Sequence, residues 1–346
     1  MRITAITPMK NEGPFILEWL AYHLMIGIND FVVFTNDCED GTDAILERLD
    51  ELGLVRHLPN PSCVRESADG HHWAAMSYVD AMPRLRRSDW IVSFDLDEFI
   101  CVNAGEGRMS DLFDAVPNAD FISMNQLNFG CAGVESYDPD TMLMKQFDRS
   151  MHKSNQPYGW DRARGVKTIT RGSAPFDRMG NHSPHVSRKD LNWVNGNGDP
   201  LSPDLYSGTL KSTKGDNFGH DLVQLNHYAL RSMENYLVKT DRGDANQGAM
   251  EEEKYWRQYW NSYDYNVAVD HNIQRWTYET RLAMDELLKD EELNSLHHQA
   301  VEWHQTRIAH LRGCDLQQDI FNSSRHRHSR KLKQELETAQ ELHEAA

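Results

Sequence analysis

The chain has 346 residues, of which 39% are hydrophobic, and this length and composition suit a large folded unit with a buried core. Its 36 Lys and Arg stand against 53 Asp and Glu, which gives a formal net charge of −17. Because affinity for nucleic acid comes largely from clustered Lys and Arg, this acidic balance argues against a general nucleic-acid binder but leaves room for a small basic pocket. The sequence has no run of about 20 apolar residues and no signal-like first segment, so we predict a cytoplasmic protein.

The first 130 residues alternate between strand and helix patterns. Short β-prone or apolar runs predict strands at residues 2–7, 30–35, 54–58, 90–94 and 120–125. Helical periodicity or turn signals predict helices between them, at residues 15–24, 43–52 and 72–82. Pro14 suits the first turn of the first helix, and Thr42 is the expected N-cap of the second. This alternation predicts an α/β fold with a Rossmann-like, mainly parallel sheet flanked by helices.

Three polar clusters fall at the ends of predicted strands, at residues 10–12, 36–40 and 95–98. In a parallel sheet, ligands bind beyond the carboxyl ends of the strands. In the third cluster, Asp95 and Asp97 are two residues apart after a buried strand, so alternation would point both carboxylates to one side. Such a pair can hold Mg²⁺ or Mn²⁺ against a diphosphate. The alternative is an acidic turn that caps a helix.

The second half of the chain has weaker periodicity. Residues 135–225 are rich in Gly, Pro, Asn, Asp and Ser, which indicates substrate-binding loops, and residues 231–312 are predicted to be helical. Aromatic pairs occur in this helical part, at Tyr255, Trp256, Tyr259 and Trp260. We favour core packing for them over a sugar-stacking platform. The tail is predicted to be a solvated helix, and the alternative is a peripheral membrane contact through its basic segment 325–333.

The five cysteines lie far apart, at positions 38, 63, 101, 131 and 314. Their odd number and the lack of any Cys-x-x-Cys pair exclude a disulfide framework and a zinc ribbon of the usual spacing. We therefore expect reduced, structural thiols.

The motifs together resemble the glycosyltransferase family 2 and family 92 group of GT-A enzymes, most closely the family 92-like branch. The early motifs that carry this resemblance are Lys10-Asn11-Glu12-Gly13, Phe15 to Trp19, Asn36-Asp37 with Asp40-Gly41-Thr42, and Phe94 to Phe99. The later ones are Asn128-Phe129-Gly130, Val166 to Ile169, and Asn226-His227-Tyr228 with Ser232, Lys239, Arg242 and Gly243. The resemblance spans residues 3–243.

This resemblance implies a nucleotide-diphosphate-sugar donor and a Mn²⁺ or Mg²⁺ cofactor. The implied metal site is Asp95, Asp97 and His227. The implied nucleotide-sugar site contains Thr7, Asn11, Glu12, Asn36, Asp37, His72, Lys239 and Arg242, with His72 at a position where relatives often carry glutamine. The corresponding division of the chain is a GT-A domain at 1–230 and a helical C-terminal extension at 231–346. Within the domain, residues 1–130 would bind the nucleotide sugar and residues 131–230 the acceptor.

The expected reaction transfers a sugar, most simply a hexose, to a glycan or lipid-linked acceptor by a single inverting displacement, as in polysaccharide biosynthesis. A general base must activate the acceptor hydroxyl. Asp177 and Asp221 are candidates, although each also suits a turn. His182 and His185 are expected on the acceptor side, and without an acidic or cysteine partner they do not make a zinc site.

Two other functions remain open at this point. A sugar nucleotidyltransferase would have a similar nucleotide site. Such enzymes generally carry a Gly-rich loop after the first strand, and residues 7–13 of this chain are not Gly-rich, which argues against this alternative. A glycan-binding or scaffold protein on a transferase fold is the second alternative. The presence of Asp95, Asp97 and His227 together argues against it, because a binding module needs no cation beside a leaving group.

Overall fold

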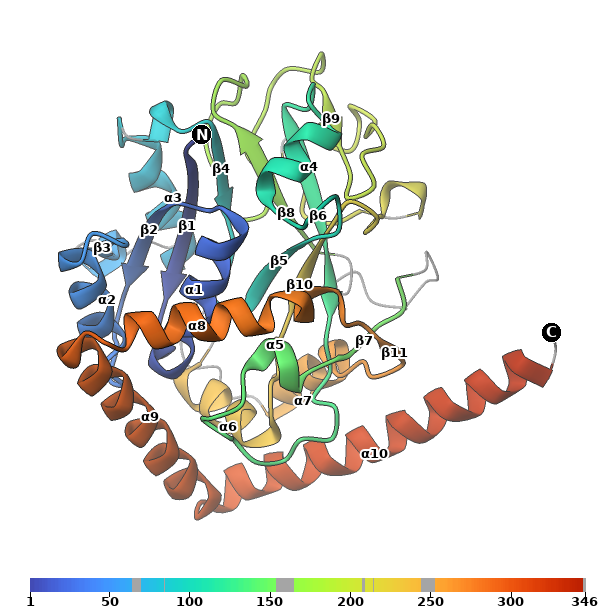
Figure 1. Cartoon of the computed structure of the whole chain (residues 1–346). Helices are drawn as coiled ribbons and strands as arrows, with labels where there is room; N and C mark the ends of the chain where they lie inside the picture. The colour runs from blue at the N-terminus through green and yellow to red at the C-terminus, as the bar shows by residue number, and fades with distance from the viewer. Residues whose placement is uncertain are drawn as a thin grey trace.

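A computed structural model describes residues 1–63, 70–83, 85–153, 165–206, 209–213, 215–243 and 253–344. Its centre is a nine-stranded sheet in the order β3-β2-β1-β4-β8-β6-β10-β5, with β9 also paired to β6 (Figure 1). The strands are β1 (Ile3–Met9), β2 (Asp30–Thr35), β3 (Arg56–Pro59), β4 (Trp90–Ser93), β5 (Glu98–Val102), β6 (Phe121–Asn128), β8 (Val166–Arg171), β9 (Trp193–Val194) and β10 (Val223–His227). A separate two-stranded sheet pairs β7 (Arg149–Ser150) with β11 (Ala268–Val269).

The first four strands of the sheet are parallel, because β1 pairs in parallel with both β2 and β4, and β2 with β3. Their carboxyl ends therefore meet at one edge. Beyond them, β8 runs antiparallel to β4 and β6, while β10 is parallel to β6 and antiparallel to β5. The predicted α/β fold with a mainly parallel sheet and flanking helices is confirmed.

Ten α-helices are described. They are α1 (Ile16–Ile26), α2 (Thr42–Glu51), α3 (Gly70–Asp80), α4 (Met109–Ala115), α5 (Leu143–Gln146), α6 (Met233–Arg242), α7 (Glu253–Tyr263), α8 (Thr277–Leu287), α9 (Glu291–Arg312) and α10 (Asp315–Glu344). Residues of α1, α2, α4 and α8 share a core with one face of β1, while α3 and the loops after β8 cover the other face. None of these helices, as far as each is described, combines the length and apolarity needed to span a bilayer.

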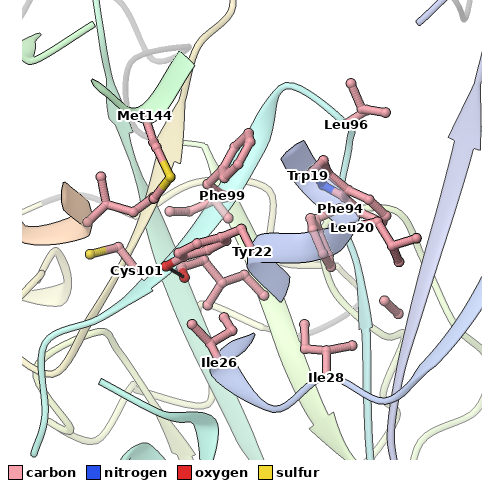
Figure 2. Close-up of a cluster of buried hydrophobic side chains, with 14 of the residues drawn as sticks. Trp19, Leu20, Tyr22, Ile26, Ile28, Phe94, Leu96, Phe99, Cys101 and Met144 are labelled. Carbon is pink, nitrogen blue, oxygen red and sulfur yellow. Dashed lines mark hydrogen bonds between the residues drawn. The ribbon is translucent and has the colours of Figure 1, made fainter. Parts of the chain in front are cut away.

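Helix α1 lies inside the larger core, which explains why nearly all of its residues are apolar or aromatic. Trp19 packs against Phe31 and Phe94, with ring centroids 5.5 and 5.3 Å apart. The hydroxyl of Tyr22 donates to the carbonyl of Ile100 at 2.7 Å, the buried polar contact marked in Figure 2. Because its one polar group has a partner, Tyr22 can be fully buried.

Several local expectations need correction. Thr42 is the first residue of α2 rather than its N-cap, which is Gly41, and its hydroxyl accepts from the backbone amide of Glu12 instead. Strand β4 ends at Ser93, so Asp95 and Asp97 lie in a turn and not on a strand. The segment 135–225 is not all loop, because it contributes β8 and β10 to the middle of the sheet.

The helices after residue 231 pack back on the first half of the chain: α8 contacts α1, and α9 contacts α2. Arg48 of α2 pairs with Asp290, the N-cap of α9, at 2.7 Å. In Figure 1, α10 leaves the body of the molecule and its end extends away from it. The helical C-terminal part is thus confirmed, and the boundary at residue 230 stays a prediction.

Candidate functional site

A cavity of about 540 Å³ lies at the carboxyl ends of the parallel strands. Its walls come from the end of β1, the turn between β4 and β5, the end of β10, and helices α3, α6 and α7. Eight of the fifteen predicted site residues line this cavity: Glu12, His72, Asp95, Asp97, His182, His227, Lys239 and Arg242. The fold therefore brings residues from both halves of the chain to one place.

Asp97 lies on the side of the turn that faces the second half of the chain. Lys239 Nζ of α6 donates to its Oδ2 at 2.8 Å, and His227 Nε2 of β10 lies 3.8 Å from its Oδ1. Burial alone would raise the pKa of Asp97, but Lys239 and then His227 outweigh it and hold this pKa well below its usual range. Asp97 is therefore an ionised carboxylate beside a cation and an imidazole.

His227 is oriented by a residue on the neighbouring strand. His227 and Asn128 are paired in the parallel register of β10 and β6, and the ring Nδ1 lies 3.0 Å from Asn128 Oδ1. Because an amide oxygen only accepts, Nδ1 carries the proton and the Nε2 lone pair faces Asp97. Burial lowers the pKa of His227 to about 4, so the ring is neutral at pH 7. A neutral, oriented imidazole is the form that binds metal ions.

Asp95 lies in a different environment on the other side of the turn. Its two oxygens are 3.1 Å from His72 Nε2 and 3.1 Å from Lys167 Nζ. Lys167 is only 1% exposed, and it also donates to Asn181 Oδ1 at 2.8 Å and lies 3.6 Å from Glu98 Oε2. Burial opposes ionisation of Asp95, but Lys167 and then His72 lower its pKa well below the usual range.

The structure thus brings two of the three predicted metal ligands into contact. Asp97 and His227 are neighbours, whereas the ligand atoms of Asp95, Asp97 and His227 are not all within 4.8 Å of one another. Sequence reasoning missed the role of Lys167. Its signal was a lysine among the β-branched residues Val166, Thr168 and Ile169, since a charged side chain inside a buried strand needs a partner.

Glu12 and Arg242 form the wall at the end of β1. Both oxygens of Glu12 accept from arginines, Oε1 from Arg242 and Oε2 from Arg231 at 2.9 Å. Arg242 also donates to the carbonyl of Lys10 at 2.8 Å. Burial alone would raise the pKa of Glu12, but Arg231 and Arg242 together lower it. The guanidinium of Arg242 is thereby fixed at the cavity wall, with Glu12 as the residue that positions it.

The remaining predicted residues lie outside the cavity lining. Thr7 is fully buried in β1, and Asn11 binds the backbone amide of Glu39 at 2.8 Å. Asn36 donates to Asp37 at 3.0 Å beyond the end of β2. Asn11, Asn36 and Asp37 therefore make hydrogen bonds within the loops at the strand ends, while Thr7 belongs to β1 itself.

The predicted acceptor and base residues are divided. His182 lines the cavity, and burial lowers its pKa to about 4, while His185 does not line it. Asp177 and Asp221 are exposed and do not line it either: Asp177 accepts from Ser187 at 3.0 Å, and the backbone amide of Asp221 donates to Asn197. This placement agrees with the alternative expectation, that Asp177 and Asp221 are turn residues.

Helix α7 presents aromatic rings to both the core and the cavity. Trp260 is buried against Tyr236, with ring centroids 4.9 Å apart, as expected for core packing. Tyr255, Trp256, Tyr259 and Tyr263 line the cavity. Tyr259 lies 5.1 Å from Lys239 Nζ, and the Tyr263 ring is edge-on to His227. The aromatic pairs therefore form one wall of the site as well as part of the core.

An α/β fold with an acidic turn, an oriented imidazole and fixed cations at the strand ends defines a protein that binds a ligand at this edge of its sheet. Comparison of the sequence with family models gives a match to glycosyltransferase family 92 over residues 3–197, more than half of the chain. The chain belongs to glycosyltransferase family 92.

Curated relatives bear the same family name. A family 92 protein of Ricinus communis is 28% identical over 114 residues, which is 32% of this chain and 18% of that protein. A family 92 protein of Oryza sativa is 29% identical over 97 residues, 27% of this chain and 15% of that protein. The matched stretch thus spans less than a fifth of these relatives' length.

Solved structures give weaker likenesses. S. aureus TarS 1–349 has a TM-score of 0.31 at 12% identity, covering 76% of this chain and 70% of that one. A complex of TarS 1–349 with UDP has a TM-score of 0.30 at 13% identity, covering 88% and 90%. The family assignment rests on the sequence match.

Proposed function

We propose that this protein transfers a sugar, a hexose in the simplest case, from a nucleotide-diphosphate-sugar donor to a glycan or lipid-linked acceptor. The observation that carries the proposal is the meeting of Asp97, His227, Lys239 and Arg242 at one cavity beyond the parallel strands. The two positive side chains of this group, Lys239 and Arg242, suit a negatively charged diphosphate. The family membership supports the same reaction class.

A divalent cation, Mn²⁺ or Mg²⁺, fits the side chains on the Asp97 side of the turn. Asp97 supplies an ionised oxygen, and His227 supplies a neutral Nε2 held in place by Asn128. Such an ion supplies charge neutralisation for the diphosphate leaving group. Both oxygens of Asp95 contact His72 and Lys167, so we assign Asp95 to positioning the turn and not to direct ligation.

The other residues would act by binding and positioning. Arg242, held by Glu12, and Lys239, held near Asp97, place two positive charges at the cavity wall where the diphosphate would lie. Tyr255 and Tyr259 offer ring faces or edges for a sugar. We expect a single inverting displacement. We do not assign the general base to Asp177 or Asp221, because neither lines the cavity.

A thermal-shift screen of nucleoside diphosphates, with and without Mn²⁺, tests the proposal. A ligand that binds only the folded state raises its apparent stability by RT ln(1 + [L]/Kd). We expect at least one nucleotide to raise the melting temperature, more strongly with Mn²⁺, and the matching nucleotide sugar to be hydrolysed slowly or transferred. Binding of no nucleotide would contradict the proposal. Glycan binding without donor turnover would favour a scaffold, and pyrophosphate release from a sugar phosphate and a nucleoside triphosphate would favour a nucleotidyltransferase.

The basic segment 325–333 lies on α10, where Arg330 is exposed and Arg325 pairs with Glu135 at 2.8 Å. For a cytoplasmic enzyme with a lipid-linked acceptor, we propose that this segment contacts anionic head groups at the membrane surface. Sedimentation with phosphatidylserine vesicles tests this: we expect salt-sensitive binding that Arg330→Glu weakens. Equal binding of neutral vesicles would contradict it.

A further inference from the structure

Three buried side chains of different chemistry meet outside the cavity lining. Cys131 follows β6, Asp264 follows α7, and His328 lies on α10. One ligand atom from each lies within 4.8 Å of the other two, and among the described residues no other set of three Cys, His, Asp or Glu does so. The cluster is separate from the proposed catalytic site, because none of its members lines that cavity.

The distances within the cluster are close to those of a metal site. His328 Nδ1 is 2.9 Å from Asp264 Oδ2 and 3.3 Å from Cys131 Sγ. Zinc bonds of about 2.0 Å to nitrogen or oxygen and about 2.3 Å to sulfur place tetrahedral ligand atoms roughly 3.3–3.6 Å apart. An expansion of a few tenths of an ångström would therefore make room for the ion.

Neighbouring groups orient two of the three ligands. Asp264 Oδ1 accepts from the backbone amide of Cys131 at 3.1 Å and from Asn266 Nδ2 at 2.8 Å, so the other oxygen faces His328. The backbone amide of Gly133 donates to Cys131 Sγ. Ala132 and Gly133 reach this geometry through left-handed φ angles of 50° and 74°. Outer contacts of this kind hold metal ligands in place. Burial and the neighbouring Asp264 raise the pKa of the Cys131 thiol, so the thiol keeps its proton until a metal ion displaces it.

The donor set selects the metal. A thiolate with an imidazole and a carboxylate suits zinc, whereas thiolate is a poor ligand for Mg²⁺ and Mn²⁺. We propose that Cys131, Asp264 and His328 bind a zinc ion, with one enclosed water molecule as its fourth ligand. Binding takes the proton from the Cys131 thiol and releases it to solvent.

The position of the cluster gives the ion its role. Among the α10 residues whose side chains are described, 315–334, the buried ones are Ile320, Phe321, Ser324 and His328, and the side chains of residues 329–334 are exposed or half-buried. The zinc ion would therefore fasten α10 at the last buried turn of this described part, near the ends of β6 and α7. The competing arrangement is a plain hydrogen-bonded triad, in which the Asp264 carboxylate accepts from both His328 Nδ1 and the Cys131 thiol.

Metal analysis of the full chain separates these two. After expression with zinc and dialysis, we expect about one zinc per chain by plasma mass spectrometry. Replacement by Co²⁺ should produce thiolate-to-cobalt charge-transfer absorption. The Asp97→Asn variant should keep this absorption, because the catalytic cavity offers no thiol, and this separates the inference from the proposed function. Wild-type protein with no stoichiometric zinc and no such absorption would overturn the proposal.

Variants assign the ligands. Cys131→Ser should abolish the cobalt absorption, and His328→Gln should weaken zinc binding at least tenfold. Cys314→Ser is the matched control: Cys314 Sγ also lies beside an imidazole, 3.9 Å from His310 Nε2, and that pair belongs to no three-ligand set among the described residues. Absorption lost in Cys314→Ser but kept in Cys131→Ser would also overturn the proposal. The wild-type measurement decides even if a variant fails to fold.

Discussion

The two sides of the acidic turn are held in different ways. On the Asp95 side, the almost fully buried Lys167 of β8 contacts Asp95 and lies near Glu98. On the Asp97 side, β10 and α6 supply an imidazole and a lysine that both line the cavity. Two carboxylates separated by one residue can therefore differ in role: we propose that Asp95 fastens the turn to the sheet and that Asp97 faces the ligand. This contrast predicts that substitutions on the first side affect mainly stability and those on the second side mainly activity.

Asp97→Asn should give the largest effect on activity. It removes the negative oxygen beside His227 while keeping the shape of the side chain, so transfer should fall on the order of 10³-fold, the loss typical of a removed charge-stabilising group. The unfolding midpoint should also fall, because Lys239 loses its buried partner, so turnover is measured at a temperature where both variants are folded. The control is Asp177→Asn, an exposed carboxylate outside the cavity, which should keep wild-type turnover. Equal activity of the two variants would remove Asp97 from the site.

Lys167→Met should give the largest effect on stability. It leaves Asp95 and the fully buried Glu98 without their cation, and breaking a buried pair typically costs about 3–5 kcal/mol. Urea unfolding at pH 7 measures this. Lys289→Met is the control, because Lys289 pairs with Glu286 and both side chains are exposed, so its loss should cost less than about 1 kcal/mol. Similar costs for both variants would contradict the assigned difference.

Lys239→Met should weaken nucleotide binding more than it weakens the fold. Its ammonium contacts Asp97 at the cavity wall, and loss of a charged contact to a diphosphate costs about 1.5–3 kcal/mol, or roughly 10- to 150-fold in Kd. Calorimetric titration measures the change. Lys289→Met, which removes an exposed pair with Glu286 on the surface, should leave Kd unchanged. An unchanged Kd in Lys239→Met would place the diphosphate elsewhere.

A pH titration tests how α6 is held on the Asp97 side. His304 lies 2.8 Å from Asn235 of α6, and burial, with a smaller contribution from Arg231, lowers its pKa to about 3. The unfolded chain then binds more protons than the folded one between pH 6.5 and 3, so the free energy of unfolding should fall as the pH falls through this range. His304→Gln should flatten this dependence. An unchanged slope would show that His304 is protonated in the folded protein.

Tyr259→Ala should have the smallest effect. Loss of one aromatic face at the cavity should raise the KM for a sugar substrate by a few-fold, equivalent to about 0.5–1.5 kcal/mol. Tyr278→Ala, which removes a tyrosine that is 70% exposed on α8, is the control and should have no effect. A fall in kcat with unchanged KM would instead indicate a role for Tyr259 in the chemical step.

Local patterns in the sequence predicted much of this arrangement. The apolar runs of β1, β2 and β4 and the polar residues after them gave the sheet and its functional edge, because these signals are contiguous in the chain. The environment of Asp95 could not be predicted, because Lys167 is 72 residues away in the chain. It reaches Asp95 only because β8 lies between β4 and β6 in the sheet, antiparallel to both. The sequence left Asp177 and Asp221 as either bases or turn residues, and the fold decides for turn residues, because neither lines the cavity.

The same limit explains the buried cluster. Cysteine spacing argued against a zinc ribbon, and that reasoning holds for ligands close together in the chain. Cys131 and His328 are separated by 197 residues, and only the packing of α10 against the ends of β6 and α7 brings them together. No local spacing rule detects such a set.

Calorimetric titration of the nucleotide identified by the thermal-shift screen tests the central claim most directly. Wild-type protein, Asp97→Asn and His227→Gln would each be titrated with and without Mn²⁺. The account predicts that Mn²⁺ tightens nucleotide binding at least tenfold in the wild type and leaves it unchanged in both variants. An equal gain from Mn²⁺ in all three proteins, or none in the wild type, would contradict it.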